Sequence, residues 1–358
     1  MSKKYKTAVF IGRFQPIHNA HIKTIKKGLE IADNLIIVVG SSNKPPTIKN
    51  PWNAEQRIYI IKKAILEEYG EATHKKWSDT VKPTILHRII FVKTRDYLYN
   101  DYKWSTEVYS KAIDKAATDD KKTVLLGCMK DDSSYYLKMF PQWDLHKMPY
   151  LWNLDSTDIR KALFEQGSLK KEDKVPDIVI KEVERWKRFS KDRFNGLIGE
   201  YQHYKDYHKQ WEKAPYPPTF NTVDALVIKS GCALLIKRGF RPGKGLWALP
   251  GGFLDNSQRI KDSALRELKE ETRIRIPKKE LDQSIKDMQI FDHPQRSLRG
   301  RTITYAYLID LGNGTLPKVK ADSDAEGAFW LPMGDVHKGE NRFFEDHHSI
   351  IVKLTSKY

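Results

Sequence analysis

Short apolar runs alternate with helical segments in the first half of the chain, and this alternation limits the fold more than any other feature. The run TAVFIG precedes a segment in which Ile22, Ile25 and Leu29 recur at helical spacing, and the fully apolar run LIIVVG follows it. The same order recurs, with RIIFV and TVLLG as later strands. Strands that alternate with helices predict an α/β domain with a doubly wound parallel sheet, whose ligands bind beyond the carboxyl ends of the strands.

The second half of the chain has a different pattern. Two strands, VDALVIK and CALLIKR, flank a Ser-Gly turn, a further strand lies near TITYAYLI, and one strongly marked helix lies between them. This order predicts an α+β domain with a mixed sheet. A helical, basic stretch and then three prolines in APYPPTF separate the halves. We therefore expect a first domain over residues 1–175, a linker over 176–220 and a second domain over 221–358.

The composition favours anionic partners but not nucleic acid or a membrane. The net charge is +17 over 358 residues, yet the lysines are scattered, and the sequence has neither a zinc-finger spacing nor an aromatic RNA-binding motif. No apolar run reaches the roughly 20 residues that span a bilayer, and the amino terminus leads straight into a strand. Cys128 and Cys232 have no pairing or metal-ligand spacing. We expect a soluble, cytoplasmic protein with buried thiols, and the sequence leaves open whether it forms a homo-oligomer.

The loop GRFQPIHNAH follows the first strand directly and combines features of a turn with basic groups. Gly12 permits unusual backbone angles, Pro16 stiffens the loop, and a plain strand-to-helix turn would need no more than that. The loop also carries Arg13 and two histidines, His18 and His21, three residues apart. Cationic and donor groups at the carboxyl end of a parallel strand predict a phosphate site.

A second stretch, DSTDIRKAL at residues 155–163, predicts the start of a helix. Ser156 or Thr157 is suited to cap it, and Arg160 lies about one turn inside. Unpaired N–H groups and a partial positive charge make a helix amino terminus attractive to phosphate. Taken alone, the stretch is typical of any capped helix. Paired with the histidine loop, it indicates a second phosphate-binding element.

These motifs resemble those of the nucleotidyltransferases, whose Rossmann-like domain carries an H-x-G-H loop and a later S-T-x-x-R element. The resemblance is closer to the nicotinamide mononucleotide (NMN) adenylyltransferases of archaeal type, and it covers roughly residues 5–165. One departure is Ala20, which stands where the H-x-G-H glycine is expected. The matching stretches are GRFQPIH, GSS at 40–42, NPW at 50–52 with Arg57, DYLYNDYKW at 96–104 and KDDSSYYLKMFPQW at 130–143.

The resemblance implies direct adenylyl transfer from ATP to NMN, which needs no protein nucleophile because a phosphate oxygen attacks. It implies that His18 and His21 donate to the ATP phosphates with Arg13 nearby, while the S-T-x-x-R element holds the leaving pyrophosphate with Mg²⁺. For Trp104, the sequence favours NMN binding and a half-buried packing role equally. The implied catalytic residues are Arg13, His18, His21 and Arg160. The implied substrate-binding residues are Gly12, Phe14, Ser41, Arg57, Asp96, Trp104, Lys130, Asp131, Ser156 and Thr157.

In the second half, PGGFLDNSQRIKDSALRELKEETRI at residues 250–274 gathers acidic groups on one helix face. Glu267 lies three and four positions before Glu270 and Glu271, so the three carboxylates are neighbours. Such crowding destabilises an isolated helix and predicts divalent cations held by oxygen ligands. Gly251 and Gly252, just before the helix, allow close approach by a phosphate or a metal.

This stretch resembles the Nudix box, whose R-E-x-x-x-E-E core is present from Arg266 to Glu271. The resemblance implies metal-activated water that attacks a pyrophosphate bond, with Mg²⁺ or Mn²⁺ as the cation. The implied catalytic residues are Glu267 and Glu271, and the implied metal ligands are Glu267, Glu270 and Glu271. Gln258 replaces an expected glutamate and removes a charged partner of Arg266, and Arg273 replaces an expected glycine. We expect the activity to persist in weakened form.

The pairing of the two domains resembles the bifunctional proteins of NAD metabolism, in which the Nudix domain is implicated in hydrolysis of ADP-ribose. By this resemblance GLWALPGGF and FDHPQRSLRGR line the ADP-ribose pocket, with Trp247 and Phe291 as neighbours of the adenine, and Gly251 and Gly252 in substrate binding. A separate loop often supplies the catalytic base. The candidates are Asp322, Asp324 and Glu326.

The sequence leaves three other functions open. The first domain could act on another phosphate acceptor, although the NPW and DYLYNDYKW stretches count against this. The second domain could be a non-catalytic ligand sensor, which Gln258 favours and the intact R-E-x-x-x-E-E core opposes. A nucleic-acid-associated hydrolase is favoured only by the basic charge balance.

Overall fold

The computed structural model describes residues 3–71, 84–116, 119–129, 132–151, 154–321 and 325–356. The chain forms two compact units, Met1–Ile198 and Gly199–Tyr358, and the boundary falls inside helix α6 (Lys191–Lys209). No helix in the described ranges is long and apolar enough to cross a bilayer.

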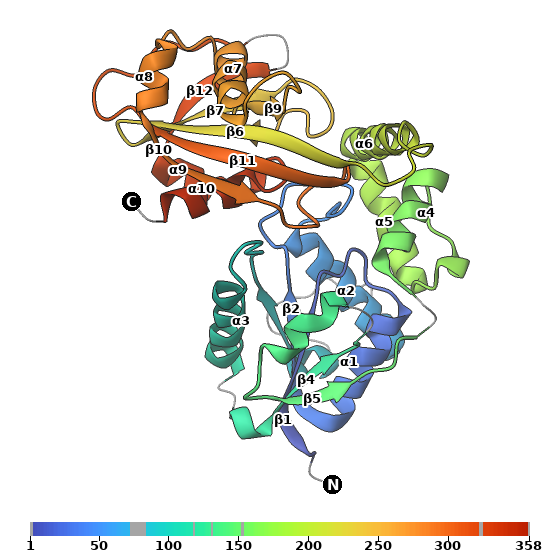
Figure 1. The fold of residues 1–358 in the computed structure, drawn as a ribbon. Coiled ribbons are helices and arrows are strands. Elements are labelled where there is room, and N and C mark those ends of the chain that lie inside the picture. Colours follow the sequence, from blue (N-terminus) through green and yellow to red (C-terminus); the bar gives the residue numbers. More distant parts are fainter. Residues whose placement is uncertain are drawn as a thin grey trace. The chain divides into compact units, whose positions relative to one another are not determined.

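The first unit contains a five-stranded sheet in the order β3-β2-β1-β4-β5, and all of its strand pairs are parallel. Successive residues of β1 face opposite sides: Val9 packs in a cluster with Val108 of α3, whereas Ala8 lies near Gly28 of α1. Figure 1 shows α1 and α3 on opposite sides of this sheet. The predicted doubly wound parallel sheet is therefore confirmed. Its elements are β1 (Tyr5–Gly12), α1 (Asn19–Ile31), β2 (Ala32–Val39), α2 (Ala54–Glu68), η1 (Thr84–Arg88), β3 (Ile89–Lys93), α3 (Asp101–Ala116), η2 (Asp120–Lys122), β4 (Thr123–Gly127), η3 (Asp132–Lys138) and β5 (Asp144–Lys147).

Helices follow the sheet in the segment that the sequence predicts as the end of the first domain and the linker. The elements are α4 (Ser156–Gln166), η4 (Lys171–Asp173), α5 (Asp177–Phe189) and the start of α6. α4 ends at Gly167, whose φ of 74° suits a glycine. α5 buries Val179, Val183 and Trp186, and Trp186 packs edge-on against Trp52, so this helix belongs to the core of the first unit.

The second unit contains a mixed sheet in the order β10-β11-β6-β7-β12, in which β6 and β11 are parallel and the other pairs are antiparallel. Leu265 and Leu268 of α7 pack on Val223 and Val227 of β6 in a buried cluster. Figure 1 shows α7 and α10 on opposite sides of the sheet. The predicted α+β domain is confirmed. Its elements are β6 (Thr219–Lys229), β7 (Cys232–Arg238), β8 (Trp247–Ala248), β9 (Gly251–Phe253), α7 (Ile260–Thr272), α8 (Lys278–Gln283), β10 (Ile285–Phe291), β11 (Arg301–Asp310), β12 (Ala325–Pro332), α9 (Met333–Lys338), η5 (Glu340–Arg342) and α10 (His347–Thr355).

Candidate active sites

The two histidines of the first unit lie together at the amino terminus of α1. Their ring centroids are 3.6 Å apart and the rings are stacked at 24°. The backbone N–H of His18, the residue that precedes the helix, donates to Nδ1 of His21 at 3.3 Å. Burial, and then the charge of His18, lower the pKa of His21 well below its usual range. His21 is therefore a neutral imidazole at pH 7 with its proton on Nε2, which leaves Nε2–H as a donor.

Two buried arginines hold the histidine loop by its backbone. Arg57 is 1% exposed and donates through Nη1 to the carbonyls of Arg13 and Gly40, at 2.6 and 2.7 Å. Arg160 donates through Nη1 to the carbonyl of Gln15 at 2.8 Å. Burial lowers the pKa of each guanidinium to about 10, so both stay charged at pH 7. Arg57 and Arg160, two of the three arginines predicted for this site, thus contact protein carbonyls and fix the loops beyond β1 and β2.

Gln15 is a residue of this site that the sequence analysis missed. Its side chain is completely buried, and its amide pairs with the backbone of Trp52: Nε2–H donates to the carbonyl at 2.9 Å, and Oε1 accepts the N–H at 3.2 Å. The hydroxyl of Ser156 donates to the carbonyl of Pro16 at 3.1 Å. The histidine loop is therefore held from three directions. The only signal in the sequence was an amide side chain inside the loop, which does not reveal its partner.

The start of α4 differs from the prediction. The cap is Asp155, whose carboxylate accepts the N–H of Thr157 at 2.8 Å, so the prediction that Ser156 or Thr157 caps this helix is wrong. A capping side chain accepts from the second or third helical residue, and Asp155 is the residue placed to do so. Ser156 and Thr157 lie in the first turn, and Thr157 is exposed. The N–H of Thr157 bonds to Asp155 and the hydroxyl of Ser156 bonds to Pro16, so the groups left to face a phosphate are the N–H of Ser156 and the hydroxyl of Thr157.

All but two of the other predicted residues of the first site lie in the described part of the chain. Phe14 is buried edge-on against His21 at 5.0 Å, and a Cβ on Gly12 would lie 2.8 Å from the Phe14 ring, so a glycine is needed there. Ser41 is buried with φ of 50°. Trp104 packs edge-on against Tyr136 and Phe140. Asp96 is half-buried, and its charge acts on Arg57. Lys130 and Asp131 lie outside the described residues.

In the second unit the acidic face of α7 meets strand β9. Glu271 accepts the N–H of Gly251 at 2.8 Å. Burial, with the charges of Glu267 and Asp224 adding to it, raises the pKa of Glu271 to about 8. A Cβ on Gly252 would lie 2.7 Å from the carboxyl carbon of Glu267, so a glycine there lets the strand reach the helix. The carboxylates of Glu267 and Glu271 are therefore crowded, and that of Glu271 is hard to ionise. Such a pair suits a divalent cation, which would neutralise the negative charge.

No group of three or more His, Cys, Asp or Glu side chains converges as a ready metal site within the described residues. Glu270 instead accepts from Nη1 of Arg266 at 2.6 Å, and Glu267 accepts from Nη2 at 2.7 Å. Glu267 and Glu271, the more buried pair, are the carboxylates best placed for a cation.

Comparisons with known proteins agree with this geometry. A cytidylyltransferase-like family model matches residues 9–162, and a NUDIX domain model matches residues 218–352. A nicotinamide/nicotinic acid mononucleotide adenylyltransferase of Acinetobacter baylyi is 37% identical over 45% of this chain and 77% of its own. An ADP-ribose pyrophosphatase of Methanocaldococcus jannaschii is 35% identical over 36% of this chain and 69% of its own.

A solved structure extends the likeness to the whole chain. The bifunctional NMN adenylyltransferase/ADP-ribose pyrophosphatase of Francisella tularensis, in complex with AMP and a manganese ion, is 32% identical, with a TM-score of 0.87 over 99% of each chain. The chain belongs to this bifunctional family. The resemblance seen in the sequence is confirmed, and with it the presence of an adenylyltransferase domain and a Nudix pyrophosphatase domain.

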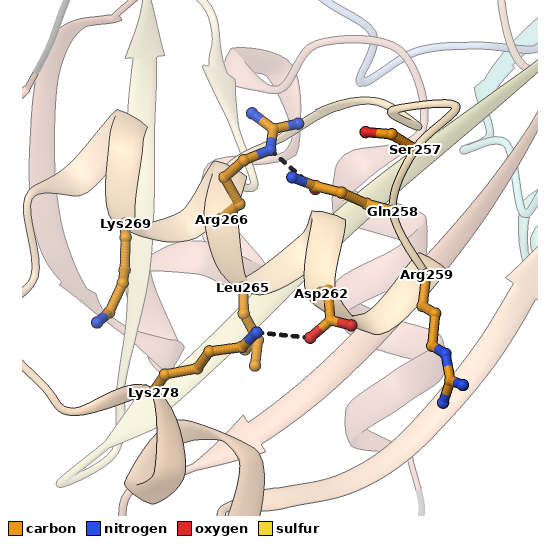
Figure 2. Close-up of a pocket in the computed structure, with 8 residues that line it drawn as sticks. All are labelled: Ser257, Gln258, Arg259, Asp262, Leu265, Arg266, Lys269 and Lys278. Carbon is orange, nitrogen blue, oxygen red and sulfur yellow. Dashed lines mark hydrogen bonds and ion pairs between the residues drawn. The ribbon is translucent and has the colours of Figure 1, made fainter.

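The two departures from the Nudix pattern have local structural solutions. Oε1 of Gln258 accepts from Nε of Arg266 at 3.0 Å, so a neutral oxygen takes the place of the expected carboxylate (Figure 2). Arg273 ends α7 with φ of 48°, the left-handed conformation that glycine adopts at less cost. The contact between Glu271 and Gly251 is present with both departures in place.

The remaining predicted residues of the Nudix domain lie in different surroundings. Phe291 is 2% exposed, which leaves no ring face open to adenine. Trp247 is half-buried, edge-on to Phe329 and Phe343. Among the candidate bases, Glu326 pairs with Lys237 at 3.2 Å, whereas Asp322 and Asp324 lie outside the described residues.

Asp224 is a residue of the Nudix site that the sequence analysis missed. It is 5% exposed, accepts from the Thr304 hydroxyl at 2.6 Å and acts on the pKa of Glu271. An aspartate inside the apolar strand VDALVIK was the available signal.

Proposed function

We propose that the first unit transfers the adenylyl group of ATP to NMN, and that the second unit hydrolyses ADP-ribose to AMP and ribose 5-phosphate. The observation that carries this proposal is the full-length likeness to a bifunctional enzyme, with the histidine loop and the R-E-x-x-x-E-E core both present. ATP, NMN and ADP-ribose are accordingly the substrates.

In the first unit a phosphate oxygen of NMN attacks the α-phosphorus of ATP, and pyrophosphate leaves. Negative charge develops on phosphate oxygens, and His21 offers Nε2–H beside the positive amino terminus of α1. His18, stacked on His21, lies within reach of the same oxygens. Arg57 and Arg160 act by fixing the loop that carries both histidines. Catalysis then follows from positioning and charge stabilisation, with no protein nucleophile.

In the second unit Glu267 and Glu271 would hold a divalent cation, for which we propose Mg²⁺. When bound, the cation supplies an activated water and neutralises charge on the diphosphate. The N–H of Gly251 fixes one carboxylate, and Arg266 fixes the other. The protein thereby orients the carboxylates before the cation arrives.

The test is to incubate the full chain with Mg²⁺ and either ATP plus NMN or ADP-ribose alone, and to identify the products by chromatography. The proposal predicts NAD and pyrophosphate from the first mixture, and AMP and ribose 5-phosphate from the second. Absence of either product pair under saturating substrate would overturn the corresponding half.

A further inference from the structure

His347, the first residue of α10, is a buried histidine that accepts a hydrogen bond from the backbone of a distant loop. The residue is 7% exposed, and its Nδ1 accepts the N–H of Leu249 at 3.1 Å. Burial lowers the pKa of His347 by more than the neighbouring carboxylates raise it, so the ring is neutral at pH 7. A neutral ring that accepts through Nδ1 carries its proton on Nε2.

Leu249 lies between two short strands that pair with different neighbours. β8 pairs with β7, β9 pairs with β6, and the register of neither pair includes Leu249. The residue is 1% exposed, so water does not replace a partner for its N–H. A buried N–H without an acceptor is costly, and His347 supplies that acceptor at the point where the chain passes from one strand to the next.

The same segment of chain positions Glu271. Two residues beyond Leu249, the N–H of Gly251 donates to Oε2 of Glu271 at 2.8 Å. β9 lies tightly against β6 here, because a Cβ on Gly251 would lie 2.2 Å from the carbonyl oxygen of Val223 and 2.6 Å from Oδ1 of Asp224. The contact between Gly251 and Glu271 therefore tolerates little displacement of the chain at Leu249.

The residues just before α10 anchor the histidine. The N–H of Phe344 donates to the carbonyl of Trp247 at 2.8 Å, which joins this turn to β8. Arg296 donates through Nε and Nη2 to the two carboxylate oxygens of Asp346, each at 2.9 Å, and both side chains are 2% exposed. A bidentate pair of this kind fixes geometry as well as contributing energy. His347 is thus held in place through the residue that precedes it.

We propose that His347 is a positioning residue of the Nudix reaction: its Nδ1 holds the N–H of Leu249 and so keeps Gly251 against Glu271, one of the carboxylates proposed to bind the cation. Groups that orient a metal-binding side chain typically change metal affinity or activity by about 10- to 100-fold when they are removed. This inference rests on the proposed hydrolysis of ADP-ribose and names the residue that sets one of its carboxylates.

The test compares variants of the full chain. His347→Phe keeps a ring of similar shape but removes the acceptor, so the Mg²⁺ concentration for half-maximal ADP-ribose hydrolysis should rise by about 10- to 100-fold, with a smaller change in KM for ADP-ribose at saturating Mg²⁺. His347→Asn places an amide oxygen close to the position of Nδ1 and should recover most of the loss. His337→Phe, at an exposed position of α9, is the matched control and should behave as the parent does. NAD synthesis should be unaffected in all three variants.

Two measurements without substrate separate this inference from the proposed reaction. In the metal-free chain, hydrogen–deuterium exchange of peptides that cover residues 247–253 should be faster in His347→Phe than in the parent, and slow again in His347→Asn. The rise in melting temperature of the second unit on addition of Mg²⁺ should be smaller in His347→Phe and restored in His347→Asn. If these changes occur but the parent cleaves no ADP-ribose, the positioning role stands and the proposed hydrolysis fails.

Three results would overturn the positioning role. The first is a parent that cleaves ADP-ribose and a His347→Phe variant with the same Mg²⁺ dependence, whatever its exchange rate. The second is a His347→Asn variant as impaired as His347→Phe, because the acceptor would then not be what matters. The third is faster exchange throughout the second unit of His347→Phe, which would assign the loss to unfolding.

Discussion

The two active sites use buried charge in opposite ways. In the adenylyltransferase domain, the guanidinium groups of Arg57 and Arg160 donate to backbone carbonyls of the loops that carry the site. In the Nudix domain, Glu271 is buried near Glu267 and Asp224, and its pKa is raised to about 8. In the first arrangement, carbonyl groups of the protein itself partner the buried charges. In the second, repulsion between the carboxylates remains, and a bound cation would relieve it. We therefore expect a preassembled phosphate site in the first domain and a cation-dependent site in the second.

The largest expected effect separates the domains by activity. His18→Ala removes a group proposed to stabilise charge in the transition state, and loss of one such donor costs on the order of 100- to 1,000-fold in turnover. We expect NAD synthesis to fall by that factor while ADP-ribose hydrolysis is unchanged, as measured on one preparation. Normal NAD synthesis by the variant would remove His18 from the mechanism.

Arg57→Met tests whether the first site is preassembled. The substitution leaves the carbonyls of Arg13, Gly40 and Ser41 without their donor, which should destabilise the first unit by about 3 kcal/mol. Chemical denaturation should show a lower midpoint for this unit, with ADP-ribose hydrolysis retained. Arg185→Met, at an exposed position of α5, is the control. An unchanged midpoint together with a raised KM for NMN would show that Arg57 binds substrate, as the sequence predicts.

The pH dependence of stability tests the repulsion in the Nudix site. The pKa of Glu271 is raised from 4.5 to about 8, so the folded unit favours the protonated carboxyl. Its contribution to stability is fully present below about pH 4.5 and is lost as the pH rises to about 8. Without metal, the melting temperature of the second unit should fall over this window, and Mg²⁺ should restore it. Glu271→Gln should flatten the dependence, and an equally steep fall in that variant would assign it to another group.

Gln258→Glu is the smallest change expected to alter activity. A carboxylate would replace the neutral oxygen that now accepts from Arg266, and a charge-assisted hydrogen bond is stronger by an amount that corresponds to about two- to fivefold in rate. We expect ADP-ribose hydrolysis to rise by that factor, measured as kcat/KM. A decrease would mean that Gln258 suits the site better than glutamate does.

The sequence predicts the secondary structure and fold class of both domains well, because apolar periodicity and turn residues are local signals. The β1 run TAVFIG and the crowded carboxylates of α7 lie where the pattern places them. The partners of buried polar groups are not local. Arg57 bonds to carbonyls 16 to 44 residues away, and Gln15 pairs with Trp52, so only the fold reveals that these side chains hold loops. Burial of Phe291 is likewise a property of the packed unit.

The central claim is that one chain carries two separate catalytic sites, and a crossed assay of His18→Ala and Glu271→Gln tests it most directly. Both variants are given ATP plus NMN and, separately, ADP-ribose, each with Mg²⁺, and the products are quantified. We expect His18→Ala to lose only NAD formation. We expect Glu271→Gln, whose size and helix propensity are nearly unchanged, to lose only the formation of AMP from ADP-ribose. A variant that loses both activities while it stays folded, or a Glu271→Gln protein that cleaves ADP-ribose at the parent rate, would contradict it.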